Sequence, residues 1–328
     1  MRVLVTGGAG YLGSVVAKRL LDDGYHVRVL DSLLHGGHAL LGLYQYDNFE
    51  FIRGDIRSPQ TMKNALEGVH ATVHLAAIVG DPACAENPDL AREVNIDASL
   101  QLFNLSEHEG VERFVFASTC SNYGNSLDSS EYVTEDSELR PISLYAETKV
   151  AVEKALLEFP LNDGPAVTVL RLATAFGLSP RMRFDLTVNE FTMELLTKRR
   201  LVVYGEQFWR PYVHVLDVAR AVTMVLGAPL KKVGRQVFNV GDTNANFQKA
   251  QLVELICGQI GGELVVERIQ KDEDPRNYRV SFDRISQGLG FRTVRTVEDG
   301  VREIIDAISQ GVITEYESSL FRNSVLHN

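Results

Sequence analysis

The sequence predicts an α/β protein: a Rossmann doubly wound parallel sheet with a smaller mixed α/β C-terminal lobe that binds substrate. Short apolar runs alternate with segments of helical period over the first 170 residues, and a glycine-rich loop joins the first run to the first helix. After about residue 172 the loops lengthen and short strands mix with short helices. We therefore expect a first domain over residues 1–172, a lobe over 173–310, with the chain free to cross between them, and a tail over 311–328.

The first domain owes its predicted sheet to six short apolar runs bounded by turns, at residues 3–5, 27–30, 49–52, 71–75, 114–116 and 167–170. Runs of this kind are typical of strands buried on both faces, which means a parallel sheet covered by helices. Leu12, Val15, Val16 and Leu20 mark the first covering helix. Ligands of such a sheet bind beyond the carboxyl ends of its strands.

The second lobe is predicted from less regular signals. Long loops are expected at residues 178–185, 204–212 and 270–278. One helix is clear: Thr296 is its N-cap, Glu298 and Asp299 lie in its first turn, and an apolar stripe begins at Val297. Residues 311–328 carry little periodicity, so we expect them to fray.

Composition excludes several classes of function. The chain has 23% charged and 45% apolar residues, as ordinary globular proteins do. Its 33 Lys and Arg against 43 Asp and Glu leave a net charge of −10, which disfavours nucleic acid and anionic membranes as partners. No apolar run is long enough for a spanning helix, and no secretory signal opens the chain. Three scattered cysteines suit neither disulfides nor a metal site, so we expect a cytoplasmic protein without a metal.

The glycine loop predicts a dinucleotide site. Gly7, Gly10 and Gly13 follow the first strand and lead into a helix at Tyr11 and Leu12, so backbone N–H groups and the helix N-terminus can approach a pyrophosphate. Asp31 ends the second strand, at a distance along the chain that suits a ribose-binding carboxylate. Because a carboxylate there repels a 2′-phosphate, NAD is favoured over NADP. Asp55 and Ile56 follow the third strand, where the adenine would lie.

Tyr145 and Lys149 predict the reactive end of the site. They are four residues apart in a segment of helical period, so they share one face. A tyrosine becomes a base near pH 7 only if its phenolate is stabilised by about 4 kcal/mol. A lysine ammonium about 4 Å away supplies roughly that amount at an effective dielectric of about 20. The strand before this helix ends in Ser118 and Thr119, which provide a hydroxyl for the substrate oxygen.

Taken together, these motifs resemble the extended short-chain dehydrogenases/reductases of the nucleotide-sugar epimerase/dehydratase family. The resemblance covers nearly the whole chain, at residues 6–13, 31, 54–56, 74–77, 118–119, 145–149, 210–215 and 238–241. It is nearest to sugar-nucleotide 4-epimerases and GDP-heptose 4-dehydrogenases. It implies NAD as cofactor and a nucleoside-diphosphate sugar as substrate.

The resemblance also implies roles for single residues. Tyr145 is the general base, Lys149 orients the cofactor ribose and lowers the tyrosine pKa, and Thr119 holds the reacting hydroxyl. Further cofactor contacts fall on Leu75, Ala76, Ala77, Asn95 and Ser118. The candidate substrate contacts are Thr119, Ser121, Thr174, Arg181, Asn189, Arg210 and Arg276. Among these, Arg181 and Arg276 are candidates independently of the resemblance, because their charge suits phosphates.

A departure from the family narrows the expected reaction. Dehydratases of the family carry an acidic pair after the hydroxyl residue, whereas this chain has Cys120 and Ser121. Neither suits both proton transfers near neutral pH. We therefore expect NAD-dependent hydride transfer at C4 of the sugar, by a 4-epimerase or 4-dehydrogenase and not a 4,6-dehydratase. The alternatives are an NAD(P)H-dependent keto-sugar reductase and a non-catalytic dinucleotide-sensing module.

Two helical segments predict a homodimer. Residues 90–105 and 150–157 are apolar on more than one face, so one stripe of each covers the sheet and the other needs a partner. A four-helix contact across a two-fold axis would bury the second stripe. Burial under the second lobe is the alternative.

Overall fold

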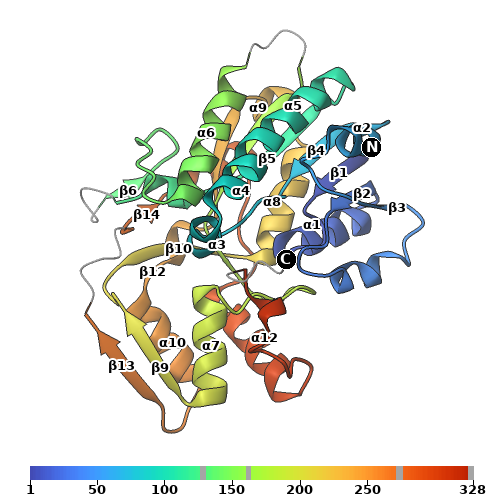
Figure 1. Ribbon diagram of the computed structural model, residues 1–328. Helices are drawn as coiled ribbons and strands as arrows, with labels where there is room; N and C mark the ends of the chain where they lie inside the picture. Colours follow the sequence, from blue (N-terminus) through green and yellow to red (C-terminus); the bar gives the residue numbers. More distant parts are fainter. Residues whose placement is uncertain (126–130, 160–163, 271–275, 324–328) are drawn as a thin grey trace.

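The parallel sheet is the frame of the molecule. A computed structural model describes residues 1–125, 131–159, 164–270 and 276–323. Seven strands pair in parallel in the order β11 (Gln236–Val240), β7 (Ala166–Leu172), β5 (Arg113–Thr119), β4 (Ala71–His74), β1 (Arg2–Thr6), β2 (His26–Asp31) and β3 (Phe49–Arg53). The six predicted strands are confirmed. Strand β11 is a seventh, which the chain adds when it returns from the second lobe (Figure 1).

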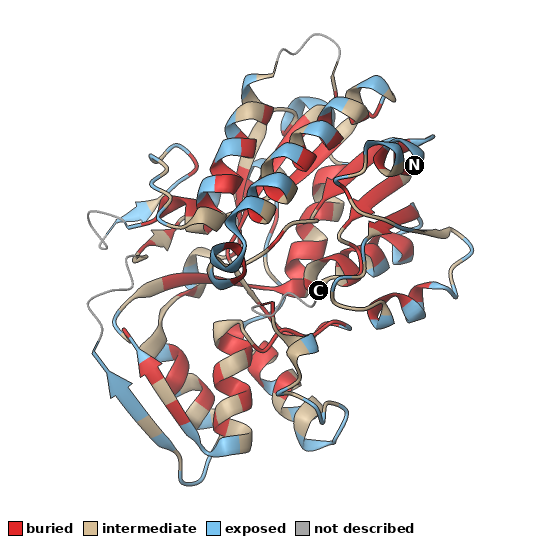
Figure 2. Cartoon of the chain, in the orientation of Figure 1, coloured by how far each residue is buried: buried red, intermediate tan, exposed pale blue. Residues whose placement is uncertain are grey.

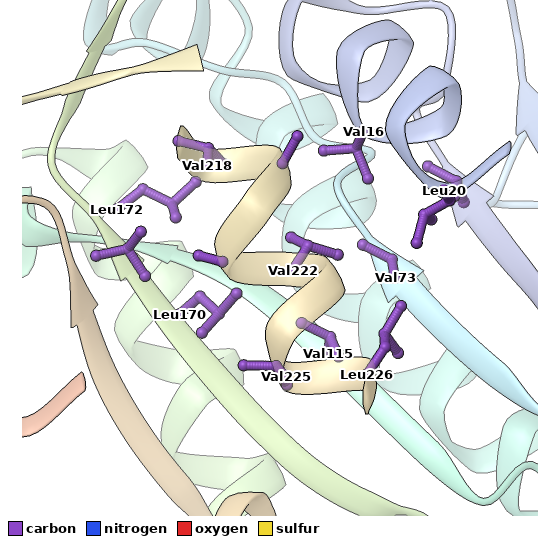
Figure 3. Close-up of a cluster of buried hydrophobic side chains, with 14 of the residues drawn as sticks. Val16, Leu20, Val73, Val115, Leu170, Leu172, Val218, Val222, Val225 and Leu226 are labelled. Carbon is purple, nitrogen blue, oxygen red and sulfur yellow. The ribbon is translucent and has the colours of Figure 1, made fainter. Parts of the chain in front are cut away.

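Helices cover both faces of the sheet. Helices α2 (Pro59–Leu66), α5 (Ala98–His108) and α6 (Leu144–Glu158) pack on one face. Helices α1 (Tyr11–Asp22) and α8 (Val215–Gly227) pack on the other. Figure 3 shows Val222 and Leu226 of α8 directed at the sheet and at α1. The inner strands are therefore largely buried on both sides, as Figure 2 shows, whereas the edge strand β3 is only partly buried.

The second lobe lies over the carboxyl edge of the sheet. Its core joins α7 (Thr187–Lys198), α10 (Lys249–Ile260) and α12 (Val297–Ser309) to β9 (Arg200–Tyr204), β13 (Val265–Ile269) and β10 (Trp209–His214). Strand β10 lies between β8 (Thr174–Phe176) and β12 (Asn246–Gln248). Thr296 caps α12 in a capping box with Asp299, as expected.

The remaining elements are short. They are α3 (Asp81–Glu86), α4 (Pro88–Arg92), β6 (Tyr132–Val133), α9 (Leu230–Val233), β14 (Arg279–Val280) and α11 (Asp283–Leu289), with 3₁₀ turns at His38–Leu43, Cys120–Tyr123, Thr243–Ala245 and Ser319–Phe321. A π-helical turn, Glu93–Asp97, links α4 to α5, so the helix expected over residues 90–105 is irregular at its start.

Two expectations for the second half are wrong. The loop expected over residues 204–212 is shorter, because β10 begins at Trp209 and pairs with β12. The tail does not fray over its described part. The Phe184 N–H donates to the carbonyl of Phe321 at 2.8 Å, and the two rings pack edge to face. Residues 271–275 and 324–328, which belong to the predicted third loop and tail, lie outside the described residues.

The chain crosses between the lobes after residue 214. Helix α8 and strand β11 lie in the first domain, and α10 and α12 lie in the second lobe. In the part of the chain that the structure describes, no helix has the length and apolarity needed to cross a membrane.

Candidate active site

A cavity of about 730 Å³ lies where the carboxyl ends of the strands meet the second lobe. It runs from the glycine loop and the end of β2 to the end of β5 and the start of α6. Arg210, Arg276 and Tyr278 line its far end. The position agrees with the rule for doubly wound sheets.

The glycine loop is packed too closely for side chains. Gly7 has φ of +73°, and a Cβ there would lie 2.8 Å from the backbone of Ala76. A Cβ on Gly13 would lie 2.0 Å from the carbonyl oxygen of Gly7. Helix α1 follows at Tyr11, and its N-cap residue Gly10 supplies no side-chain hydrogen bond. Tyr11, Leu12 and Gly13 of its first turn line the cavity, so the N-terminus of α1 lies at the cavity wall, where its N–H groups and dipole favour a pyrophosphate.

Asp31 is fixed at the rim of this loop. Its carboxylate accepts hydrogen bonds from the N–H groups of Ala9 at 2.9 Å and Leu33 at 2.7 Å. Burial raises the pKa of Asp31, while these two N–H groups and the charge of Arg181 lower it. A carboxylate and a glycine cradle on the same wall fit the ribose and pyrophosphate of NAD.

The two residues expected beside the adenine, Asp55 and Ile56, lie at the wall of the cavity, and Ile56 is buried. The Arg57 guanidinium pairs with Asp55 at 2.7 Å and holds the pKa of that carboxyl below its usual value. Asp55 is therefore already paired at the rim, and Ile56 offers the apolar surface.

The segment after β4 forms the floor. Leu75, Ala76 and Ala77 line the cavity as expected. Beneath them, His74 bonds to the hydroxyls of Thr6 at 2.7 Å and Ser99 at 2.8 Å. Burial lowers the pKa of His74 to about 3, so it is a neutral core residue.

The reactive residues converge at the other end. Thr119 ends β5, and Tyr145 and Lys149 lie on α6, whose N-cap Ser143 accepts a hydrogen bond from the Ala146 N–H. All three predicted catalytic residues line the cavity, as do Ser118 and Ser121. The Lys149 ammonium donates to the carbonyl of Ala117 at 2.9 Å and lies 5.9 Å from the centre of the Tyr145 ring.

Burial dominates the electrostatics of Tyr145 and Lys149. Desolvation raises the pKa of Tyr145, and the positive charge of Arg183 lowers it. Burial lowers the pKa of Lys149 to about 8. The Lys149 ammonium is directed at the backbone carbonyl of Ala117. Arg183, like Arg181, lines the cavity.

A buried ion pair supports the reactive end. Glu153 pairs with Arg171, and both side chains are almost fully buried. The Ser118 hydroxyl donates to Glu153 at 2.8 Å, and Arg171 donates to the Tyr123 hydroxyl at 2.9 Å. The pair thus ties β5 and β7 to α6. Sequence reasoning missed it, although Glu153 lies one helical turn after Lys149 and therefore on the same face.

The far end of the cavity holds several charged groups. Arg210 donates to the carbonyls of Trp209 and Arg276, and it lies 5.4 Å from the centre of the Tyr278 ring. Arg276 pairs with Asp81 at 2.8 Å. Thr174, Arg181, Arg210 and Arg276 all line the cavity. Burial lowers the pKa of Arg181 to about 10, while the negative charges of Asp185 and Asp31 raise it.

Two predicted residues do not line the cavity. Asn95 is saturated by the backbone of Ile78 and the hydroxyl of Thr148. Asn189 is fully buried and bonds to Gly177, to the Tyr11 hydroxyl and to the Arg183 carbonyl. Each side chain bonds to a loop of the cavity wall. The structure therefore gives Asn95 and Asn189 supporting roles in place of the expected ligand contacts.

Asp81, Asp185 and Asn323 are among the wall residues that the sequence did not single out as ligand contacts. Asp185 and Asn323 are 138 residues apart in the chain and are joined by a hydrogen bond, which no pattern in the sequence predicts. Among the described residues, no cluster of three or more His, Cys, Asp or Glu side chains is placed to hold a metal ion.

Comparisons with known proteins agree with this geometry. The model of the "NAD dependent epimerase/dehydratase family" matches residues 3–241. An uncharacterized UDP-glucose epimerase of Bacillus subtilis is 30% identical over 94% of this chain and 98% of its own.

Two solved structures are similar over 95% of this chain. A UDP-glucose 4-epimerase of Thermotoga maritima, with UDP-glucose, has a TM-score of 0.84 at 28% identity and is covered over its full length, 100%. A dTDP-glucose 4,6-dehydratase of Streptomyces venezuelae, with NAD bound, has a TM-score of 0.84 at 26% identity, over 98% of its chain.

Proposed function

The chain belongs to the NAD-dependent epimerase/dehydratase family, and from that premise we propose that it transfers hydride at C4 of a nucleoside-diphosphate sugar, as a 4-epimerase or 4-dehydrogenase. It is an NAD-dependent enzyme of the extended short-chain dehydrogenase/reductase type. The observation that supports the proposal best is the convergence of Thr119, Tyr145 and Lys149 on the same cavity as the glycine loop and Asp31.

In this proposal each residue has one task. Thr119 accepts or donates a hydrogen bond at the reacting sugar oxygen, and Tyr145 removes its proton. Hydride exchange with the sugar carbon is the chemistry that NAD supplies when bound. The positive charge of Arg183 lowers the pKa of Tyr145 and so favours its phenolate. Arg210, which is nearly buried, binds the diphosphate.

Dehydration fits the site less well. Cys120 is buried, its thiol donates to the Arg171 carbonyl at 3.3 Å, and the residue does not line the cavity. Burial also raises the pKa of that thiol above its usual value. Ser121 alone faces the cavity, and it has no carboxylate to take a second proton. We therefore infer a reaction that ends at the C4 stage.

A product analysis tests the proposal. NAD-loaded protein is incubated with UDP-, GDP- and dTDP-hexoses, and products are followed by NMR as well as mass, because epimerisation leaves mass unchanged. We expect a 4-epimer or a 4-keto sugar. A 4-keto-6-deoxy sugar would contradict the exclusion of dehydration. Deuterium moving from C4 into free NADH would favour a dehydrogenase or reductase with exchanging cofactor. NAD binding without any turnover would favour a sensing module.

We further propose a homodimer in the cytoplasm. Helix α5 packs against α2 and α6, and its Leu100 stays partly exposed. On α6, Ala151 is exposed and Ala155 partly so. These small and apolar residues suit a contact between the α5–α6 faces of two copies.

A further inference from the structure

The C4 carbon of a bound sugar must lie beside Tyr145, so the groups around that ring decide which sugars fit. Tyr145 packs against Ile78 and the segment that follows it. Two ion pairs flank this segment: Arg183 with Asp185, and Arg276 with Asp81. All four side chains line the cavity.

Arg183 is held as half of a neutral pair. Its Nε donates to Asp185 at 3.0 Å and one terminal nitrogen donates to the second carboxylate oxygen at 2.8 Å, a bidentate geometry. Both side chains are largely buried, with exposed fractions of 10% and 18%. A Cβ added at Gly80 would lie 4.0 Å from the Arg183 guanidinium, so the pair borders the segment that covers Tyr145.

The C-terminal tail completes this wall. The N–H of Asn323 donates to Asp185 at 3.1 Å, and its side-chain amide donates to the Val79 carbonyl at 3.3 Å. Asn323 is 8% exposed and lines the cavity. Its Oδ1 is buried and has no hydrogen-bond partner among the described residues. Since the Nδ2 bond fixes which way the amide faces, the remaining atom is an acceptor that needs a donor.

We propose that the pairs Arg183–Asp185 and Asp81–Arg276, with Asn323, form a charge-balanced pocket that selects an uncharged sugar and rejects a uronic acid. The inference rests on the proposed function and specifies its substrate class. Two guanidinium groups and two carboxylates cancel, so a sugar carboxylate would bring an unpaired negative charge beside Asp185 and Asp81.

Paired substrates test the proposal. NAD-loaded protein is assayed for turnover with UDP-glucose against UDP-glucuronic acid, and with GDP-mannose against GDP-mannuronic acid. We expect at least about a tenfold higher kcat/KM for the neutral member of whichever pair is accepted. Equal or faster turnover of the uronate would overturn the inference and leave the proposed function standing. Turnover of no sugar nucleotide would overturn both.

Two isosteric variants locate the effect. Asp185→Asn leaves Arg183 uncompensated, so we expect the uronate-to-neutral ratio of kcat/KM to rise about tenfold. Asp306→Asn, an exposed carboxylate on α12 outside the cavity lining, makes the same change in net charge and should leave the ratio unchanged. NAD binding and circular dichroism verify that both variants fold. A ratio that Asp185→Asn does not raise would contradict the role given to this pocket.

Discussion

At the scale of single residues, burial sets the chemistry of the reactive end. Lys149 is 4% exposed, and desolvation lowers its pKa from 10.5 to about 8. Between these pH values the folded protein binds fewer protons than the unfolded chain, so its stability rises with pH through this window. The cost of burying the charge is fully present below pH 8.

Lys149→Met isolates this contribution, since other titrating groups cancel in the comparison. We expect the free energy of unfolding of the wild type, relative to the variant, to increase by about 2 kcal/mol between pH 7 and 9.5. Urea denaturation without NAD measures it. A difference that stays flat, or falls, over this range would show that the lysine is not desolvated.

We expect Asp31 to determine the preference for NAD over NADP. Its carboxylate is anchored by two backbone N–H groups at the ribose end of the cavity. Asp31→Ala should weaken NAD binding about tenfold and raise the affinity for NADP, because the repulsion of a 2′-phosphate is removed. Titration calorimetry with both cofactors measures the change. NADP binding that stays as weak as in the wild type would contradict this role.

Residue roles were predictable where the signal is local and not where it depends on tertiary contacts. The spacing of Tyr145 and Lys149 places them together, yet the direction of the ammonium follows from the position of the Ala117 carbonyl. Asn95 and Asn189 were assigned to ligands, but their amides are used up by neighbouring loops. The position of Asn323 in the cavity wall could not be predicted, since its contact with Val79 joins residues that are 244 positions apart in the chain.

At the scale of elements, α8 links the two halves of the chain. Leu226 is 2% exposed and packs between the sheet and α1 (Figure 3). Leu226→Ala should lower the free energy of unfolding by about 2–5 kcal/mol, because it removes buried methyl groups and leaves a cavity. The matched change at Leu230, which is 43% exposed, should cost less than about 0.5 kcal/mol. Urea unfolding that shows equal losses would contradict the packing of α8.

The elements themselves were predictable to different degrees. The six predicted strands of the first domain are recognisable as apolar runs, because most of them are buried on both faces; only the edge strand β3 is partly buried throughout. Strand β11 went unpredicted because it joins the sheet only after the chain has passed through the second lobe. The tail was expected to fray since its contacts with Phe184 and Asp185 leave no periodic pattern in the sequence.

At the scale of the whole molecule, we expect two copies of the chain to form a homodimer through their α5–α6 faces. Sedimentation velocity at micromolar concentration should give the mass of a dimer. Leu100→Glu places a charge on the proposed contact, where Leu100 is only partly exposed, and should shift the protein to monomer. A wild-type monomer would contradict the dimer, and a variant that stays dimeric would place the contact elsewhere.

The position of the cavity also follows from the whole fold. The carboxyl ends of the strands bring the glycine loop, Asp31 and Thr119 to one edge, and the second lobe supplies the arginines opposite. The sheet edge was predictable from the order of the motifs. The wall opposite was not, since ion pairs such as Arg276–Asp81 join segments far apart in the sequence.

The central claim is that Tyr145 takes the proton when the sugar is oxidised. Rapid mixing of NAD-loaded wild type and Tyr145→Phe with an accepted sugar nucleotide, following the near-ultraviolet absorbance of reduced nicotinamide, tests it most directly. We expect the variant to bind NAD normally and to react at least about a hundredfold more slowly. Reaction at the wild-type rate would contradict the account.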